Sequence, residues 1–341
     1  MSKSKRILIV ADLSSSPIKM FLDYTRKLAK GFIRLGHDVN IFSYRGVLLQ
    51  LSPLKSPTFA ACFFKSKVDE LLANEIRNYS PDIIHLRFAK FLDVKTIALM
   101  RQAAPNAFLI GIDGDLWPEL HKNRVQVAAK LDLMLTTYGD NGQQAFKNAG
   151  VRSVFMPNIC DPDVEHRYEV SDRWKSDILF TGKLKHKHYP TEDIRPQLVS
   201  KLAKMKNCAV YGCCGRPSIG GIQYLYAISH AKIGLSVNAV NDIRLYHSDR
   251  STQYMACGTF VLAKRVPDTD LLFRDGVHLR YFDTAEEFFD LAKWYLAHED
   301  ERIKIANAGM EHAHTEFNCM KIAKYTMDII ETGSYKAPWT D

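Results

Sequence analysis

Short apolar runs alternate with helical patterns along the chain, and this alternation constrains the fold more than any other feature. The runs at residues 6–12 (RILIVAD), 82–87 and 107–112 are each followed by a segment with a helical pattern or a turn that opens one, and a further run lies at 39–44. Buried parallel strands have this apolar, β-branched composition, and the helices that connect them build βαβ units. The sequence therefore predicts an α/β protein with doubly wound, mostly parallel sheets.

The alternation stops once and then restarts. Residues 157–163 (PNICDPD) hold two prolines and acidic residues without periodicity, and a new apolar run follows at 177–181. A chain of 341 residues has room for two domains with separate cores. We predict a first Rossmann-like domain over 1–158 and a second over 164–314. The C-terminal helix and tail, about 315–341, are expected to be able to cross back onto the first domain.

Charge is distributed unevenly between these two halves. The net charge is +8, and residues 1–160 hold 22 lysines and arginines against 13 aspartates and glutamates. This excess favours an acidic partner for the first half, such as a membrane surface, a polyanionic polymer or nucleic acid. Solvated lysine-rich helix faces are the alternative explanation.

Composition indicates a soluble, cytoplasmic protein. Hydrophobic residues make up 46% and charged residues 25%, and no apolar run approaches the ~20 residues that span a bilayer. The seven cysteines are scattered without zinc-type or redox spacing, so reduced thiols and no metal site are expected.

One segment of the first half mixes apolar and cationic residues. Residues 46–67 are broken by two prolines and combine Leu48, Phe59 and Phe63 with Lys55 and Lys65. Such a loop-like mixture suits peripheral contact with the inner face of a membrane, or an acceptor contact. A buried strand with a connecting loop is the more ordinary interpretation.

The first half also offers polar groups at the carboxyl ends of its strands, where open α/β sheets bind ligands. Ser14 and Ser15 follow the first strand, and Arg87 ends the strand at 82–87. Asp113 and Asp115 lie on a glycine-containing turn after the next strand. We expect Asp113 to do acid–base work, with a helix cap as the structural alternative, and Asp115 to cap the following helix.

The strongest signal lies in the second half, at residues 247–265. A short helix from Ser248 to about Cys257 stops at Gly258, and a buried strand follows at 259–264. His247, Ser248 and Arg250 cluster at the helix N-terminus, where free backbone N–H groups favour a phosphate or diphosphate. An ordinary helix–strand unit with a solvated arginine is the alternative.

Two further strand ends point to the same kind of ligand. Gly182 and Lys183 follow the strand at 177–181 and open a basic loop suited to a diphosphate. Ser236 and Asn238 end the buried strand at 233–238, shortly before the short helix. The first strand carries no glycine-rich dinucleotide fingerprint, so a nicotinamide-dependent enzyme is disfavoured.

Residues 250–262 (RSTQYMACGTFVL), with Asp270–Phe273, Asp275–Gly276, Tyr281–Phe282 and Ala297–Arg302, resemble the C-terminal signature of CgeB-like (spore-maturation-type) and related group 1 glycosyltransferases. The resemblance covers roughly 232–330. It implies the GT-B fold, with two Rossmann-like domains facing a central cleft. The first half resembles this family only in the order of its elements.

The resemblance implies roles for particular residues. Arg250 falls at the family's arginine, and Gly182 with Lys183 at the strand exit that meets the donor diphosphate. Ser236 and Asn238 lie beside the nucleotide, and Asp113 follows a strand from which related enzymes supply an acid or base. The ribose-binding glutamate of the family is Gln253 here, and Leu245 stands eight residues earlier, where many retaining enzymes have a second glutamate. Retention or inversion is therefore left open.

These observations predict a glycosyltransferase that moves a sugar from a UDP-, GDP- or dTDP-type donor to an acceptor hydroxyl, without a separate cofactor. A glycan, a lipid-linked acceptor, or a surface polysaccharide or glycoprotein would suit it. A phage-type DNA base glycosyltransferase and a catalytically silent nucleotide-sugar-binding protein are the alternatives.

Overall fold

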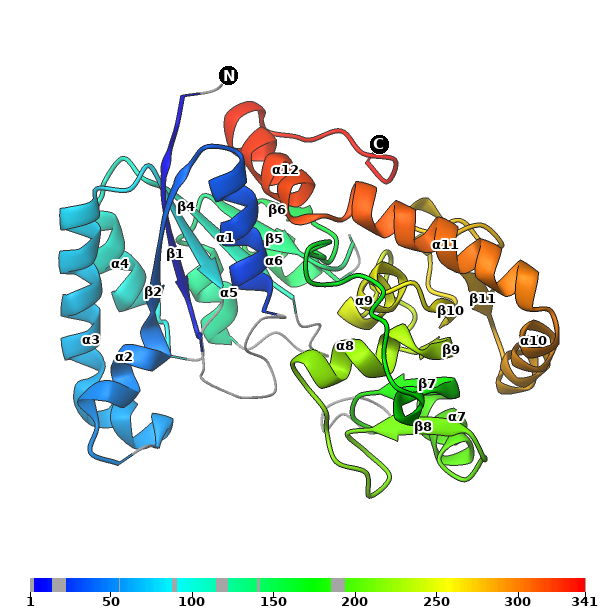
Figure 1. Cartoon of the computed structure of the whole chain (residues 1–341). Helices are drawn as coiled ribbons and strands as arrows, with labels where there is room; N and C mark the ends of the chain where they lie inside the picture. The colour runs from blue at the N-terminus through cyan, green and yellow to red at the C-terminus, as the bar shows by residue number, and fades with distance from the viewer. Residues whose placement is uncertain are drawn as a thin grey trace. The chain divides into compact units, whose positions relative to one another are not determined.

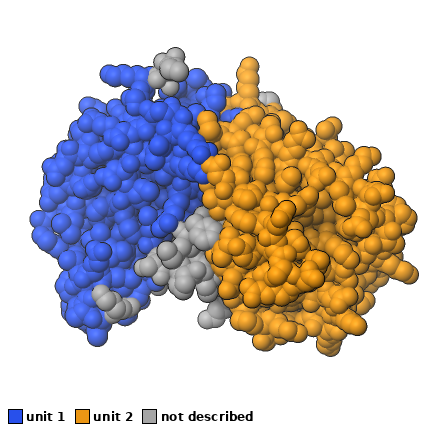
Figure 2. Space-filling view, in the orientation of Figure 1, with its two compact units in different colours: residues 1–16, 23–156, 323–334 blue, residues 17–22, 157–322, 335–341 orange. Residues whose placement is uncertain are grey.

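A computed structural model describes residues 3–13, 23–54, 56–87, 91–114, 122–139, 142–184 and 194–340. Contacts between Cα atoms divide the chain into two compact units (Figure 2). Unit 1 comprises 1–16, 23–156 and 323–334, and unit 2 comprises 17–22, 157–322 and 335–341. In the described ranges, no helix combines the length and the apolar character that a bilayer crossing requires.

Unit 1 is built on a parallel sheet of six strands in the order β2-β1-β3-β4-β5-β6 (Figure 1). Their bounds are Arg6–Ala11 (β1), Asp38–Ser43 (β2), Ile83–Arg87 (β3), Phe108–Asp113 (β4), Leu133–Thr136 (β5) and Ser153–Phe155 (β6). The connecting helices are Tyr24–Arg34 (α1), Tyr44–Leu51 (α2), Pro57–Tyr79 (α3), Val94–Ala103 (α4), Lys122–Ala128 (α5) and Gln144–Asn148 (α6). The chain runs from β1 outward to β2 on one side and to β3 on the other, so the strand order reverses between β1 and β3.

Alternate residues of the strands build the core of unit 1. Leu8 and Val10 of β1 and Ile84 and Leu86 of β3 point to the same face and pack against α2, α3 and α4. Successive side chains of a strand point to opposite faces, so Ile7, Ile9 and His85 face the other way.

Unit 2 is built on a parallel sheet of five strands in the order β8-β7-β9-β10-β11. The strands span Ser176–Thr181 (β7), Cys208–Tyr211 (β8), Ala231–Ser236 (β9), Phe260–Lys264 (β10) and Arg280–Phe282 (β11). The helices are Ile194–Leu202 (α7), Ile222–Ser229 (α8), Asp249–Ala256 (α9), Ala285–Ala297 (α10) and Glu299–Glu316 (α11), and Cys319–Thr332 (α12) carries the chain on into unit 1. Here the strand order reverses between β7 and β9.

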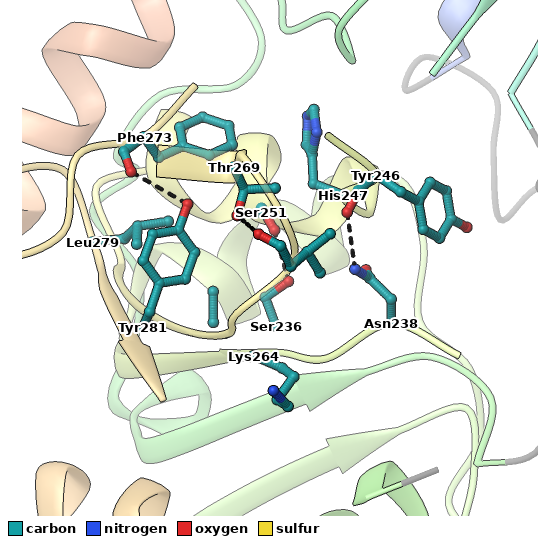
Figure 3. Close-up of a pocket in the computed structure, with 12 residues that line it drawn as sticks. Ser236, Asn238, Tyr246, His247, Ser251, Lys264, Thr269, Phe273, Leu279 and Tyr281 are labelled. Carbon is teal, nitrogen blue, oxygen red and sulfur yellow. Dashed lines mark hydrogen bonds between the residues drawn. The ribbon is translucent and has the colours of Figure 1, made fainter. Parts of the chain in front are cut away.

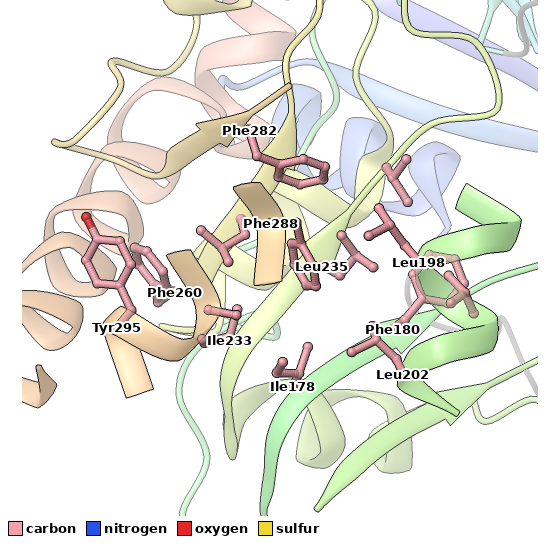
Figure 4. Packing of buried hydrophobic residues seen from close by; sticks show 14 of the residues in the cluster. Ile178, Phe180, Leu198, Leu202, Ile233, Leu235, Phe260, Phe282, Phe288 and Tyr295 are labelled. Carbon is pink, nitrogen blue, oxygen red and sulfur yellow. The ribbon is translucent and has the colours of Figure 1, made fainter. Parts of the chain in front are cut away.

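The core of unit 2 joins β7, β9 and β10 to α7 and α10 (Figure 4). Ile178 and Phe180 of β7, Ile233 and Leu235 of β9, and Phe260 of β10 are all at most 2% exposed. Burying such apolar side chains stabilises a fold by roughly 1.5–3 kcal/mol each. The strand ends that carry the candidate ligand groups are therefore attached to a rigid core.

The structure corrects the prediction for residues 46–67. This segment holds no strand and is mostly helical, because α2 covers its first residues to Leu51 and α3 begins at Pro57. Proline fits the first turn of a helix, where its missing N–H costs nothing. Ser56 caps the helix by accepting a hydrogen bond from the Phe59 amide at 3.5 Å.

Candidate functional site

The helix α9 sits where the sequence places it, between a cap at Ser248 and a glycine stop. Ser248 Oγ accepts a hydrogen bond from the Arg250 amide at 3.3 Å, and Gly258 has φ of +75°. The helix is shorter than expected by about a residue at each end. Its side chains from Ser251 to Ala256 are all buried, so α9 is a core element of unit 2.

The amides at the start of α9 are less available than the sequence suggests. The Ser248 amide donates to Asn238 Oδ1 at 3.0 Å, and the Arg250 amide is used by the cap. Asp249 also places a carboxylate in the first turn. The prediction of free N–H groups at this end is wrong for Ser248 and Arg250, so any anion here must be bound mainly by side chains.

The Arg250 side chain can bind an anion at this end of α9. Its Nε donates to the Thr181 carbonyl at 2.7 Å and its Nη1 to the Val237 carbonyl at 3.3 Å. The guanidinium carbon lies 4.9 Å from the centre of the Phe180 ring. Among the described residues no carboxylate pairs with this guanidinium. The charge is therefore fixed by neutral groups and remains uncompensated.

These contacts place Arg250 at the reversal of strand order in unit 2. Thr181 ends β7, and Val237 directly follows β9. Ligands of open α/β sheets bind at such a point, outside the carboxyl ends of the strands. The sequence predicted separately that Arg250 and the two strand ends bind the same kind of ligand. In the structure Arg250 is hydrogen-bonded to both strand ends.

Gly182 is required by this arrangement. Its φ is +142°, a conformation that residues with a Cβ rarely adopt, and a Cβ built on it would lie 2.8 Å from Arg250 Nη2. Lys183 is exposed beside it and bonds to no other described residue. Two cations, the buttressed Arg250 and the exposed Lys183, thus flank the exit of β7.

The remaining predicted side chains of unit 2 are largely engaged within the protein. Asn238 uses its amide oxygen for Ser248 and donates to the Tyr246 carbonyl at 3.2 Å, so it closes the loop between β9 and α9. Ser236 and Ser251 are buried with their hydroxyl oxygens 2.6 Å apart. Asn238 and Ser236 therefore shape the site, whatever contact they also make with a ligand.

His247 is buried to 4% exposure, and burial lowers the pKa of its imidazole to about 4. Its Nδ1 lies 3.1 Å from the Leu245 carbonyl, and its ring meets the Phe273 ring edge-to-face at 5.2 Å. The imidazole is therefore neutral at pH 7. Its Nε2 is buried and has no partner in the described ranges.

Gln253, one turn beyond Arg250, lies against α8. The Tyr224 hydroxyl is 2.8 Å from Gln253 Oε1, and both side chains are buried. The Tyr254 hydroxyl, next along α9, accepts from the Thr181 amide at 3.0 Å. The sequence did not single out Tyr224 or Tyr254, because a buried aromatic on a helix ordinarily indicates core packing alone.

A small pocket lies beside this cluster, between the ends of β9 and β10 (Figure 3). Its polar lining includes Ser236, Asn238, His247, Lys264 and Tyr281. Lys264 Nζ lies 3.3 Å from Asp283, so its charge is compensated. In the described ranges no three histidine, cysteine, aspartate or glutamate side chains are grouped as metal ligands.

In unit 1 the structure places two of the predicted residues at strand ends. Asp113 ends β4, is 2% exposed and binds Arg124 Nη1 through both carboxylate oxygens, at 2.7 and 2.8 Å. Arg87 ends β3, and its Nη1 lies 3.1 Å from both carboxylate oxygens of Asp23. Ser14, Ser15 and Asp115 lie outside the described residues.

Comparison with known proteins agrees with this geometry. Residues 185–328, within unit 2 except for the end of α12, match the model of a family described as glycosyl transferase-like. The match covers less than half of the chain. A search of curated proteins gave no significant match.

Solved structures match over nearly the whole chain. HepE of Anabaena, solved with UDP-glucose, has a TM-score of 0.61 and 14% identity over 96% of this chain and 100% of its own. Sucrose-phosphate synthase of Thermosynechococcus elongatus gives 0.65 and 15% over 96% and 98%. The N-terminal domain of Candida albicans trehalose-6-phosphate phosphatase gives 0.60 and 13% over 96% and 97%.

The chain therefore has the predicted fold, with two parallel Rossmann-like sheets as in GT-B glycosyltransferase structures. Its second unit carries the match to the glycosyl transferase-like family. These comparisons match a glycosyl transferase-like family, and they do not distinguish the CgeB-like subtype within it.

Proposed function

We propose that this protein transfers a sugar from a nucleoside diphosphate sugar to an acceptor hydroxyl. Unit 2 binds the donor, with Arg250 on its phosphates and Gly182 and Lys183 beside them. The observation that carries the proposal is the Arg250 guanidinium at the reversal of strand order, which no carboxylate of the described ranges pairs with. The family match over the same unit and the UDP-glucose bound to HepE support it.

Arg250 would act chiefly on the leaving group. As the bond between the sugar and the diphosphate breaks, negative charge builds on the phosphate oxygens. A fixed guanidinium stabilises that charge without reorganising, which is how preorganised donors lower a barrier. The Thr181 and Val237 carbonyls orient Arg250 and cannot neutralise it.

Gln253 belongs to the same proposal as a hydroxyl partner for the donor. Because its Oε1 faces Tyr224, the amide nitrogen is the group left to meet a ligand, and it can only donate. This differs from a glutamate, which can only accept. We propose that Gln253 makes the donor preference of this chain differ from that of CgeB-like relatives.

The acceptor is proposed to be acidic or membrane-associated, and bound by unit 1, where the basic excess of the first half lies. The end of the α2–α3 connection and the first turns of α3 support a peripheral contact. Leu54 is 55% and Phe63 69% exposed, and Phe59 packs against Phe63 with ring centres 4.7 Å apart. No acidic residue occurs from 39 to 68. This would place the protein on the cytoplasmic face of a membrane, with nucleic acid as a less favoured acceptor.

The test is donor hydrolysis and transfer across UDP-, GDP-, dTDP- and CMP-sugars, with the wild type and Arg250→Ala. We expect turnover with one nucleotide class and its loss in the variant at an unchanged melting temperature. Removing one preorganised donor from a developing anion typically costs about 10²–10³-fold. Turnover that survives Arg250→Ala would refute the assignment of this site.

A further inference from the structure

The first unit has a second cluster of polar groups at its own reversal of strand order, between β1 and β3. Asp12 directly follows β1, Arg87 ends β3, and Arg45 lies in the first turn of α2, directly after β2. The rule that places ligands outside the carboxyl ends of strands applies here as it does in unit 2. Neither Asp12 nor Arg45 stood out in the sequence.

Asp12 has a carboxylate oxygen available to a ligand. Its Oδ1 accepts a hydrogen bond from the Arg45 amide at 3.2 Å, and no described residue bonds to Oδ2. The residue is only half-buried, so its carboxyl is not enclosed in the core. One oxygen is thus fixed by the backbone while the other can accept a proton.

The surroundings of Asp12 tune its basicity. Burial is the largest influence and raises the pKa of its carboxyl. Arg45 and Arg87 oppose this shift, while Asp23 adds to it. A carboxylate that is more basic than usual is better suited to act as a general base.

Asp113, the acid or base expected from the sequence, differs from Asp12 because both of its carboxylate oxygens are engaged in an ion pair. Both of its oxygens bind Arg124 Nη1 and the side chain is 2% exposed. To take a proton from an acceptor, this carboxylate would have to give up a buried ion pair. Losing one partner of such a pair is costly.

Two buried polar atoms without described partners belong to residues linked to Asp12 or to Arg87. Tyr24 Oη and Arg45 Nε are buried and have no hydrogen-bond partner in the described ranges. Arg87 contacts Asp23 and lies over the Tyr24 ring at 5.8 Å. Buried polar groups in native proteins almost always have a partner, so these two atoms are candidates for hydrogen bonds to a polar ligand.

We propose that Asp12 is the general base that deprotonates the acceptor hydroxyl, and that Arg45 and Arg87 orient the acceptor beside it. The inference rests on the proposed glycosyl transfer. The acceptor proton moves to Asp12 Oδ2 while the acceptor oxygen forms its bond to the anomeric carbon. The bond to the diphosphate breaks, and its electron pair leaves with the phosphate oxygen. A single displacement of this kind inverts the anomeric configuration.

The test compares two acceptors of similar shape with UDP-glucose as donor. 4-Nitrobenzyl alcohol needs a base, whereas 4-nitrophenol is already largely ionised at weakly alkaline pH. Asp12→Asn should reduce transfer to the alcohol by about 10²–10⁴-fold and transfer to the phenol by less than tenfold. Asp38→Asn, an exposed substitution at the other end of β2, serves as the control for charge and folding.

The outcomes separate this inference from the function it rests on. Equal losses with both acceptors, or none, would refute Asp12 as the base, and a selective loss in Asp113→Asn instead would assign the base to Asp113. A product that retains the anomeric configuration would also overturn the proposal. A wild type that binds no nucleoside diphosphate and transfers no sugar would overturn the proposed function, and this inference with it.

Discussion

At the scale of single residues, one arginine and one glycine define the proposed donor site. Arg250 is fixed by two carbonyls and an aromatic ring, and Gly182 leaves the space that its Nη2 occupies. The sequence could select both, because a helix N-terminus and a strand exit are recognisable patterns. It could not show that the two residues touch, since 68 positions of chain separate them.

Gly182→Ala should therefore act through Arg250. The new Cβ would meet Nη2 at 2.8 Å in a backbone conformation that costs alanine about 1–3 kcal/mol. We expect lower stability and donor binding weakened about as much as in Arg250→Ala. The double variant should bind no more weakly than the worse single variant, because residues in contact are not additive. Fully additive losses in calorimetric titrations would show that the two residues act separately.

Two residues show why the rest of the site could not be predicted. Tyr224 contacts Gln253 from a different helix, and the pKa of the Asp12 carboxyl is shifted by burial and by the arginines near it. Both properties arise from tertiary packing, which leaves no local pattern in the sequence. Asp113 was selected because it stands in a recognisable turn, but its partner Arg124 is eleven residues away.

At the scale of elements, the parallel strands and the α9–β10 unit were predictable from apolar runs and glycine stops. The segment 46–67 was not, because its two prolines suggested breaks where one of them begins a helix. Leu54, before α3, and Phe63, on its second turn, are exposed apolar side chains that a buried strand would have covered. The membrane contact expected from the sequence therefore lies in segment 46–67, whose secondary structure was predicted wrongly.

The double substitution Leu54→Asp and Phe63→Asp tests that contact. These side chains are more than half exposed, so the change should leave folding almost unaffected. Binding to vesicles of phosphatidylglycerol should fall at least tenfold, because apolar area is lost and acidic groups are introduced. Vesicles of phosphatidylcholine alone should bind less of the wild type. Cosedimentation equal for wild type and variant would contradict a membrane role for this segment.

At the scale of the whole molecule, each sheet carries its candidate ligand groups where the strand order reverses. Arg250 marks this point in unit 2, and Asp12 with Arg87 marks it in unit 1. Two doubly wound units with distinct polar clusters suit a reaction that has two substrates. The fold alone does not fix this chemistry, since a domain of a phosphatase has it as well.

Buried neutral histidines make stability depend on pH. Burial lowers the pKa of His85 in unit 1 and His247 in unit 2 to about 4, against an ordinary 6.5. Between these values the unfolded chain binds more protons, so stability is full above pH 6.5 and is lost as the pH falls toward 4. Each histidine can contribute up to about 1.4 kcal/mol per pH unit in this range.

His85→Leu isolates one of these contributions. Both ring nitrogens of His85 lack partners in the described ranges, so the variant should be no less stable at pH 7. Urea unfolding at pH 7 and pH 5 should show a smaller loss for the variant than for the wild type. An unchanged difference between the two pH values would mean that His85 is not buried as a neutral group.

The most direct test of the central claim is calorimetric titration of the full chain with UDP, GDP and dTDP in turn. We predict that one of them binds, and that Arg250→Ala weakens its binding about 10- to 100-fold, as expected for a charge-assisted bond of about 1.5–3 kcal/mol. Arg173→Ala, an exposed arginine of the same unit, should bind like the wild type. Equal affinity in wild type and Arg250→Ala, or no binding of any of the three, would contradict a donor site at the end of β7.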